Sequence, residues 1–133
     1  MKLIITLPLP HKSLSPNYTV GSRGARLGKA AKTKKYRTDS HSAAYAAMRN
    51  RDIVFQPNWK EATAHVTFYW PTRRRRDKDN ADASLKAAWD GFVDAGLLKD
   101  DVGLTRLPTK FEYDKVQPRV VIEIWETDST KGT

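Results

Sequence analysis

Two carboxylates follow a run of four arginines in the segment RRRRDKDN, residues 73–80. Asp77 and Asp79 are two positions apart, and side chains at that spacing project to the same side of an extended chain. Carboxylates held close together repel each other, and a divalent cation relieves that repulsion. Mg²⁺ typically takes one or two protein carboxylates and leaves its other positions to water and substrate phosphate. The segment therefore predicts a cation site beside phosphate-binding side chains, which are Arg73, Arg74, Arg75 and Arg76.

A second acidic pair, Asp100 and Asp101, follows the next predicted helix. A strand, a helix and a return loop can bring this pair back to the strand end, close to the first pair. Lys86, on the polar face of that helix, is placed to hold a scissile phosphate or to neutralise its developing charge. Three carboxylates and a nearby lysine are the groups that metal-assisted phosphodiester hydrolysis requires.

Each motif also has an ordinary structural use. An Asp-x-Asp motif commonly forms a turn or a helix cap, and Asn80 either orients a ligand water or caps the following helix. Lys86 with Asp90 reads as a helical ion pair worth ~0.3–0.5 kcal/mol. The combination favours the metal site, because arginines beside acids would pair with them unless a metal ion and phosphates also competed.

Composition narrows the classes of partner and metal. The chain has 133 residues and a formal net charge of +9, and its positive charge is clustered in the arginine run and in residues 21–37. Clustered positive charge indicates a nucleic-acid partner. With no cysteine and three scattered histidines, the metal must be one that prefers oxygen ligands, Mg²⁺ or Mn²⁺. The basic segment adds candidate DNA contacts at Lys32, Lys34, Lys35 and Arg37.

The length predicts a single domain over residues 1–126, followed by a polar tail over 127–133. No apolar run approaches the ~18 residues of a membrane span. The first residues also lack the shape of a signal peptide. We therefore expect a cytoplasmic protein with no membrane partner.

The elements that must position these residues follow from the apolar patterns. Strands are predicted at 2–7, 62–70, about 103–113 and about 118–126. Helices are predicted from Thr38 or Ser40 to about 51, and from about 83 to 95 with Asp82 or Asn80 as the cap. Residues 11–37 are predicted to be a long irregular basic loop that faces DNA, either ordered by DNA or disordered without it. The order β-α-β-α-β-β predicts a two-layer α+β domain, with helices packed on one face of a mixed sheet.

These residues resemble the RusA-type Holliday-junction resolvases, the crossover junction endodeoxyribonucleases. RRRRDKDN and LKAAWDGFVDAGLLKDD, residues 85–101, carry the resemblance, and ITLPLP followed by SPN resembles the family's opening strand and proline loop. The resemblance implies a Mg²⁺-dependent homodimeric endonuclease without a small-molecule cofactor. It would resolve four-way DNA junctions by paired symmetric nicks in recombination and repair, in a bacterium or a prophage.

The resemblance also implies roles for individual residues. The family's paired metal-binding aspartates fall on Asp77 and Asp79, and its essential lysine falls on Lys86. Its third metal-binding aspartate falls on Asp101, with Asp100 as the less favoured alternative. The stretch between residues 80 and 86 is longer than in the shortest family members by close to one helical turn, which can return the lysine to the same side. Asp82, within that stretch, becomes an accessory acid.

A non-catalytic basic DNA-binding or architectural protein is the alternative function. It rests on charge alone and treats the acids as turn residues and helix caps. An RNA-binding module is disfavoured, because no exposed aromatic run resembles a stacking platform.

Overall fold

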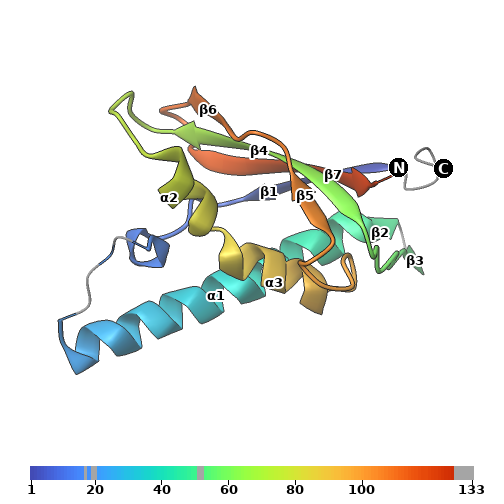
Figure 1. The fold of residues 1–133 in the computed structure, drawn as a ribbon, viewed down its shortest axis with the longest axis horizontal. Helices are drawn as coiled ribbons and strands as arrows, with labels where there is room; N and C mark the ends of the chain where they lie inside the picture. The colour runs from blue at the N-terminus through green and yellow to red at the C-terminus, as the bar shows by residue number, and fades with distance from the viewer. Residues whose placement is uncertain (17, 19–20, 51–52, 128–133) are drawn as a thin grey trace.

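The structure, a computed structural model, describes residues 1–16, 18, 21–50 and 53–127, which form a β-sheet covered on one face by helices (Figure 1). The sheet order is β1 (Lys2–Leu7), β7 (Arg119–Glu126), β4 (Ala62–Trp70) and β5 (Leu104–Arg106), and β6 (Lys110–Tyr113) also pairs with β4. β7 is antiparallel to β1 and β4, whereas β5 and β6 are parallel to β4. The predicted two-layer α+β fold with a mixed sheet is confirmed.

The core lies between the sheet and the helices because the central strands alternate as the sequence predicts. In β4, Ala64, Val66 and Phe68 are buried on the helical side. β7 buries Val120 and Ile122 against the same core. Burying a large apolar side chain contributes roughly 1.5–3 kcal/mol through the hydrophobic effect. Strand alternation is thus what fixes the ends of β4 and β7 relative to the helices.

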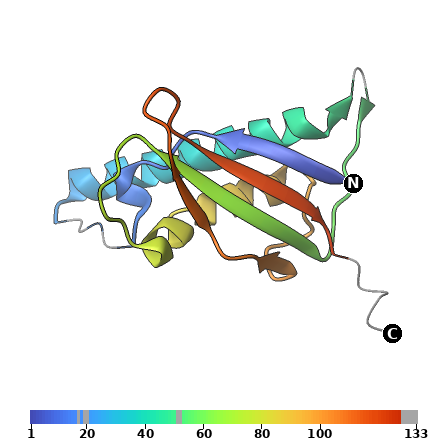
Figure 2. The same cartoon turned by 90° about the horizontal axis from the view of Figure 1, so that it is seen from above.

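The predicted basic loop at 11–37 is wrong from residue 23 onward, and the helix predicted to begin at Thr38 or Ser40 begins earlier. After a short 3₁₀ helix, η1 (Lys12–Leu14), the chain forms one long helix, α1 (Arg23–Met48). Ser22 caps α1 by accepting a hydrogen bond from the backbone N–H of Ala25 at 3.1 Å. The buried positions of α1, at Tyr36, Ser40, Ala44 and Met48, begin only in its second half. The first half extends past the sheet (Figures 1 and 2), so it has no apolar stripe that a sequence could reveal.

The helix predicted over 83–95 corresponds to α3 (Lys86–Asp94), and a separate short helix that was not predicted, α2 (Lys78–Ala83), precedes it. The two helices are separated at Ser84, whose hydroxyl donates to the carbonyl of Ala81 at 2.6 Å. α3 buries Ala88, Trp89 and Phe92, and Gly96 follows the helix with φ 82°, as expected of a C-terminal stop. The predicted caps are wrong, because Asp77 caps α2 and α3 begins without a side-chain cap.

Several smaller differences complete the fold. The strand predicted over 103–113 is interrupted between β5 and β6, and β2 (Arg49–Asn50) pairs with β3 (Ile53–Val54) in a hairpin that was not predicted. In the predicted tail, Thr127 is anchored to β4 through its hydroxyl, 2.6 Å from that of Thr63. Residues 128–133 lie outside the described residues. Among the described helices, none has the length and apolar character needed to cross a membrane.

Candidate active site and nucleic-acid interface

Asp77 and Asp79 lie at the start of α2 rather than on an extended strand. β4 ends at Trp70, and Asp77 is the N-cap residue of α2. Its Oδ1 accepts hydrogen bonds from the backbone N–H of Asp79 at 2.8 Å and of Asn80 at 3.3 Å. Asp79 is exposed in the first turn, and its carboxylate makes no hydrogen bond or ion pair within the described part of the chain. The predicted extended geometry is therefore wrong, and the two carboxylates have different surroundings.

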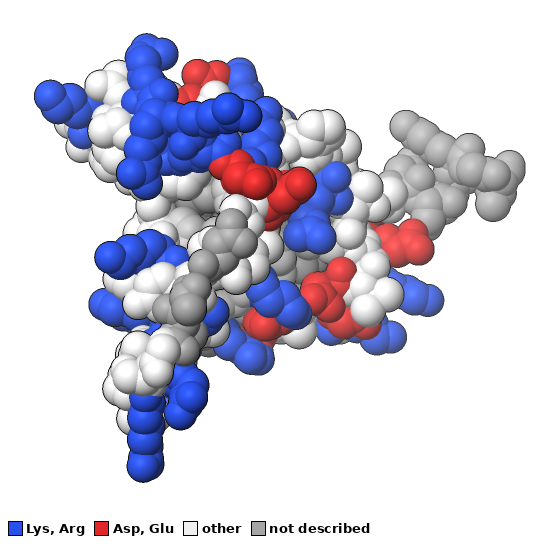
Figure 3. All heavy atoms as spheres, turned by 60° about the vertical axis from the view of Figure 1, so that its left-hand side comes forward, with Lys and Arg blue, Asp and Glu red and all other residues white. Residues whose placement is uncertain are grey.

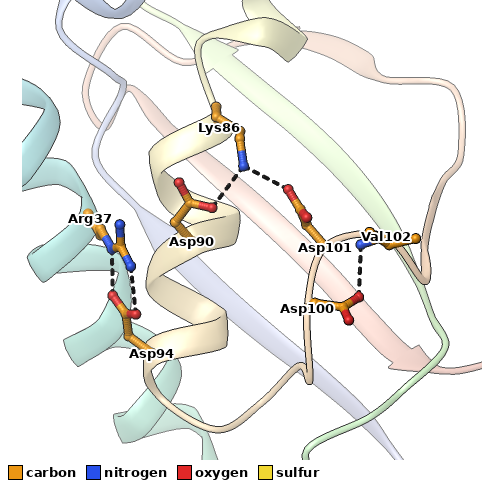
Figure 4. Close-up of polar contacts among 7 residues, drawn as sticks. All are labelled: Arg37, Lys86, Asp90, Asp94, Asp100, Asp101 and Val102. Atoms are coloured by element: carbon orange, nitrogen blue, oxygen red, sulfur yellow. Dashed lines mark hydrogen bonds and ion pairs between the residues drawn. The ribbon is translucent and has the colours of Figure 1, made fainter.

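Lys86 is the first residue of α3, and it joins two acids (Figure 4). Its Nζ donates to Asp90 Oδ1 at 2.9 Å and to Asp101 Oδ2 at 2.7 Å. The hydrogen bond to Asp101, followed by that to Asp90, raises the pKa of Lys86, and the same lysine lowers the pKa of Asp101. The loop after α3 brings Asp101 to Lys86, whose ammonium group is held in its charged form. The prediction that the second acidic pair returns close to Asp77 and Asp79 is not borne out, because no three acids among the described residues gather into a group that could hold a metal ion.

The two acids of the second pair point differently. The carboxylate of Asp100 accepts a hydrogen bond from the backbone N–H of Val102 at 3.0 Å, whereas Asp101 faces Lys86 (Figure 4). Gly103 holds this turn against the start of β4, because a Cβ at that position would overlap the carbonyl of Lys60. Of the two candidate ligands, Asp101 is the one beside the predicted catalytic lysine.

Asp82 lies in a wall of a hollow of about 300 Å³ that also includes Lys86, Asp101 and Arg106. Its carboxylate accepts a hydrogen bond from the hydroxyl of Thr109, which ties α2 to the loop between β5 and β6. Trp89 lines the same hollow, and its indole N–H is buried without a partner among the described residues. Folded proteins rarely leave a buried donor unsatisfied, so this N–H is an unusual feature beside a hollow lined by both charged and apolar side chains.

Two arginines of the run are held by contacts within the protein, and the other two are exposed. The guanidinium of Arg76 donates to the carbonyl of Thr72 at 2.7 Å and lies 4.4 Å from the centre of the Trp70 ring. Burial, and then the nearby charge of Arg74, lowers the pKa of Arg76. Arg73 stacks over Tyr113 at 4.5 Å. Arg74 and Arg75 are exposed, and neither forms a salt bridge within the described residues. The exposed members, rather than Arg76, are therefore the main candidates for phosphate contact.

The other four basic residues predicted to contact DNA lie on α1, where two form ion pairs and two are exposed. Arg37 forms a two-pronged ion pair with Asp94 of α3, at 2.6 and 2.8 Å, and Lys35 pairs with Asp39 at 2.7 Å. Lys32 and Lys34 are exposed, with no salt bridge to a described residue. The sequence reasoning missed Asp94, whose pKa is lowered mainly by the hydrogen bond that it accepts from Arg37.

The surface view shows where the charges gather. Figure 3 shows Lys and Arg side chains in two groups, one over the arginine run and one along the first half of α1, with acidic side chains between them. Arg23, Arg26 and Lys29 extend the second group toward the start of α1. A face with positive charge on two sides of an acidic centre can attract a phosphate backbone while its acids bind a cation.

The candidate metal ligands are not gathered into one cluster. Among the described residues, no three His, Asp or Glu side chains lie close enough together to hold a metal ion. Asp77 and Asp79 adjoin each other at the start of α2, and Asp101 is paired with Lys86. The oxygen donors suit Mg²⁺, which needs only one or two protein carboxylates when substrate phosphate supplies other ligands. These carboxylate oxygens therefore suit Mg²⁺ in chemical type, and they would supply part of its coordination shell.

Comparison with known proteins identifies the family. The model of the family described as "Endodeoxyribonuclease RusA" matches residues 10–125. A protein of Aquifex aeolicus (strain VF5), "Crossover junction endodeoxyribonuclease RusA", is 34% identical over 64 residues. That match covers 48% of this chain and 48% of the relative, so it spans about half the length of each. Because the family model matches most of the chain, including every candidate metal ligand and Lys86, this protein belongs to the endodeoxyribonuclease RusA family.

Proposed function

We propose that this protein is a Mg²⁺-dependent endonuclease that resolves four-way DNA junctions by paired, symmetric nicks in recombination and repair. The observation that carries the proposal is the contact of Lys86 with Asp101 at 2.7 Å, which joins residues 15 positions apart. Membership of the RusA family supports a nuclease, and the two basic groups support a DNA substrate. An architectural protein would need the charge but not this lysine–acid arrangement.

Lys86 is the proposed phosphate-binding group. An ammonium group has three N–H donors, and two of them are directed at Asp90 and Asp101. The third can donate to a nonbridging oxygen of the scissile phosphate. The two acids keep the lysine protonated, so it can stabilise negative charge that develops on the phosphate without losing its proton.

The candidate metal ligands are Asp77, Asp79 and Asp101, and Mn²⁺ is a plausible substitute for Mg²⁺. When bound, the ion would activate a water and stabilise charge on the transferring phosphate. Of these acids, Asp79 has the fewest hydrogen bonds within the protein, since Asp77 also caps α2 and Asp101 also contacts Lys86. Asn80 follows Asp79 in the first turn of α2, where its side chain can orient a ligand water.

A homodimer is part of the proposal. Two opposed nicks in a two-fold symmetric junction require two active sites, which a two-fold symmetric dimer supplies. The sheet face opposite the helices is a candidate contact surface. It carries Tyr69 and Trp125, which are partly exposed and stacked with Arg119 and Lys2. Trp59, which is buried in the core, is not a candidate.

The decisive experiment measures nicking of a synthetic four-way junction and of a linear duplex of matched sequence, with and without Mg²⁺. We expect paired, metal-dependent nicks on the junction alone. The variant Asp79→Asn should lose at least about 100-fold of the cleavage rate while still binding the junction. Glu126→Gln, which alters an exposed carboxylate at the end of β7, is the matched control and should cleave normally. Binding without nicking by the wild-type protein would instead indicate the architectural function.

A further inference from the structure

A second hollow, of about 460 Å³, lies between the arginine run, the start of α2 and the segment that precedes α1. We call it the Tyr18 pocket, and the residues used below are His11, Lys12, Tyr18, Arg74, Arg75 and Asn80. Its volume falls in the range of small-ligand sites, roughly 300–1,000 Å³. Asp77 also lines it, so the pocket adjoins a candidate metal ligand without including Lys86 or Asp101.

One side of the Tyr18 pocket is suited to phosphate. Arg74, Arg75 and Lys12 all line it, and none of them forms a salt bridge with a described residue. Arg76, which also lines it, is fastened to Trp70 and Thr72, and this anchors the loop that carries the two available arginines. The cationic side is therefore held in place by a neighbour that donates hydrogen bonds within its own loop and stacks on Trp70 at the end of β4.

The other side is suited to a nucleobase. Tyr18 is half-buried there. Its backbone N–H donates to the carbonyl of Ser15 at 3.0 Å, which holds the backbone that carries the ring. His11 Nδ1 accepts a hydrogen bond from the backbone N–H of Ser13 at 3.1 Å. The neutral imidazole therefore carries its proton on Nε2, which remains able to donate. The side-chain amide of Asn80 makes no hydrogen bond to a described residue, so it can also pair with a base edge.

We propose that the Tyr18 pocket takes one unpaired nucleotide of the DNA substrate, with its base against Tyr18 and its phosphate on Arg74 and Arg75. A base in a duplex must be unpaired and unstacked before it can enter such a hollow, at a cost of a few kcal/mol, and this cost is lower for a base at a branch point or a bulge. Aromatic stacking with flanking cations is a general means of holding single-stranded nucleic acid. The inference rests on the proposed function in taking DNA as the ligand. It assigns the preference for branched DNA to this pocket.

The test is equilibrium binding, by fluorescence anisotropy in EDTA, to a labelled duplex and to the same duplex with a short unpaired bulge. Wild-type protein should bind the bulged DNA more tightly. Tyr18→Ala should weaken binding to the bulged DNA roughly 10-fold, with binding to the full duplex changed by less than about twofold. Tyr18→Phe keeps the ring and should bind both substrates as the wild type does. Tyr45→Ala, which removes an exposed tyrosine from α1, is the control for loss of an aromatic side chain.

Two results would overturn the inference. Equal losses on both substrates would mean that Tyr18 contacts duplex DNA or supports the fold, and thermal unfolding of the variant separates these causes. No loss on either substrate would mean that the pocket does not receive the base. Because the assay contains no metal ion, a protein that fails to nick junctions in Mg²⁺ could still show selective binding. The nuclease proposal and the pocket proposal therefore fail on different measurements.

Discussion

The two acidic pairs of this protein are built on the same plan. In each pair one carboxylate accepts backbone hydrogen bonds in its own turn, Asp77 at the start of α2 and Asp100 before Val102. The carboxylate of the other member does not close its turn: that of Asp79 is exposed, and that of Asp101 contacts Lys86. The pairs differ in what the first member supports, because Asp77 caps a helix whereas Asp100 closes only a turn. In each pair, one carboxylate thus stabilises its own turn, and the side chain of the other extends away from that turn.

Within the second acidic pair, removing the charge of Asp101 should have the larger effect. Asp101→Asn is expected to lower the cleavage rate at least about 10-fold, because Lys86 loses its partner and a candidate metal ligand is neutralised. The pair is exposed, so the free energy of unfolding should change by less than about 1 kcal/mol. Single-turnover cleavage and urea unfolding measure the two effects. A large loss of stability with normal cleavage would reverse the assigned roles.

Asp77 separates capping from chemistry. Asp77→Ala should lower the free energy of unfolding by ~1 kcal/mol, because α2 loses its cap, and Asp77→Asn should change it little, because asparagine caps equally well. Both variants should lose cleavage if the carboxylate also binds the metal ion. Denaturant unfolding and the junction assay, run on both variants, test this. Normal cleavage by Asp77→Asn would make Asp77 a helix cap alone.

Asp100 is expected to give a smaller effect. Asp100→Ala removes one hydrogen bond to Val102, with a cost to unfolding of about 0.5–1.5 kcal/mol at most, since the site is exposed. Its cleavage rate should stay within about threefold of the wild-type rate, because only its neighbour faces Lys86. The same two assays apply. A defect as large as that of Asp101→Asn would show that the two members of this pair share the function.

Acid pH should produce the smallest effect. Lys86 lowers the pKa of Asp101 by donating a hydrogen bond to it. A carboxyl whose pKa is depressed on folding contributes stability above its unfolded pKa, about 3.9, and loses it as the pH falls through the folded value. The unfolding free energy of the wild type should therefore decline below about pH 4 slightly more than that of Asp101→Asn, by less than about 1 kcal/mol. Parallel unfolding curves over that range would contradict the ion pair.

The sequence predicts the central sheet and part of the site because those features are local or follow from chain order. The alternation in β4 and β7 is visible residue by residue. Lys86 and Asp101 belong to one helix and its return loop, which places them together, whereas the predicted approach of this loop to Asp77 and Asp79 is not borne out among the described residues. The RusA resemblance rests on the same segments, and the family match over residues 10–125 confirms it.

Other features depend on contacts that the sequence does not display. The first half of α1 packs on little, so its helical residues look like a polar loop. Arg37 was grouped with DNA-binding residues because its partner, Asp94, is 57 positions away. The break between α2 and α3 depends on one hydroxyl, that of Ser84, returning to the backbone. These features depend on contacts that exist only in the folded protein.

Gly91 determines how closely α1 and α3 approach each other. A side chain at this position would overlap the carbonyl of Arg37, so α1 and α3 are pressed together backbone to backbone. The Arg37–Asp94 ion pair fastens the same crossing. The helix that carries the basic residues and the helix that begins with Lys86 are therefore tightly joined at this crossing. We expect the two helices to move as one body, so that a ligand bound along α1 would displace Lys86 together with it.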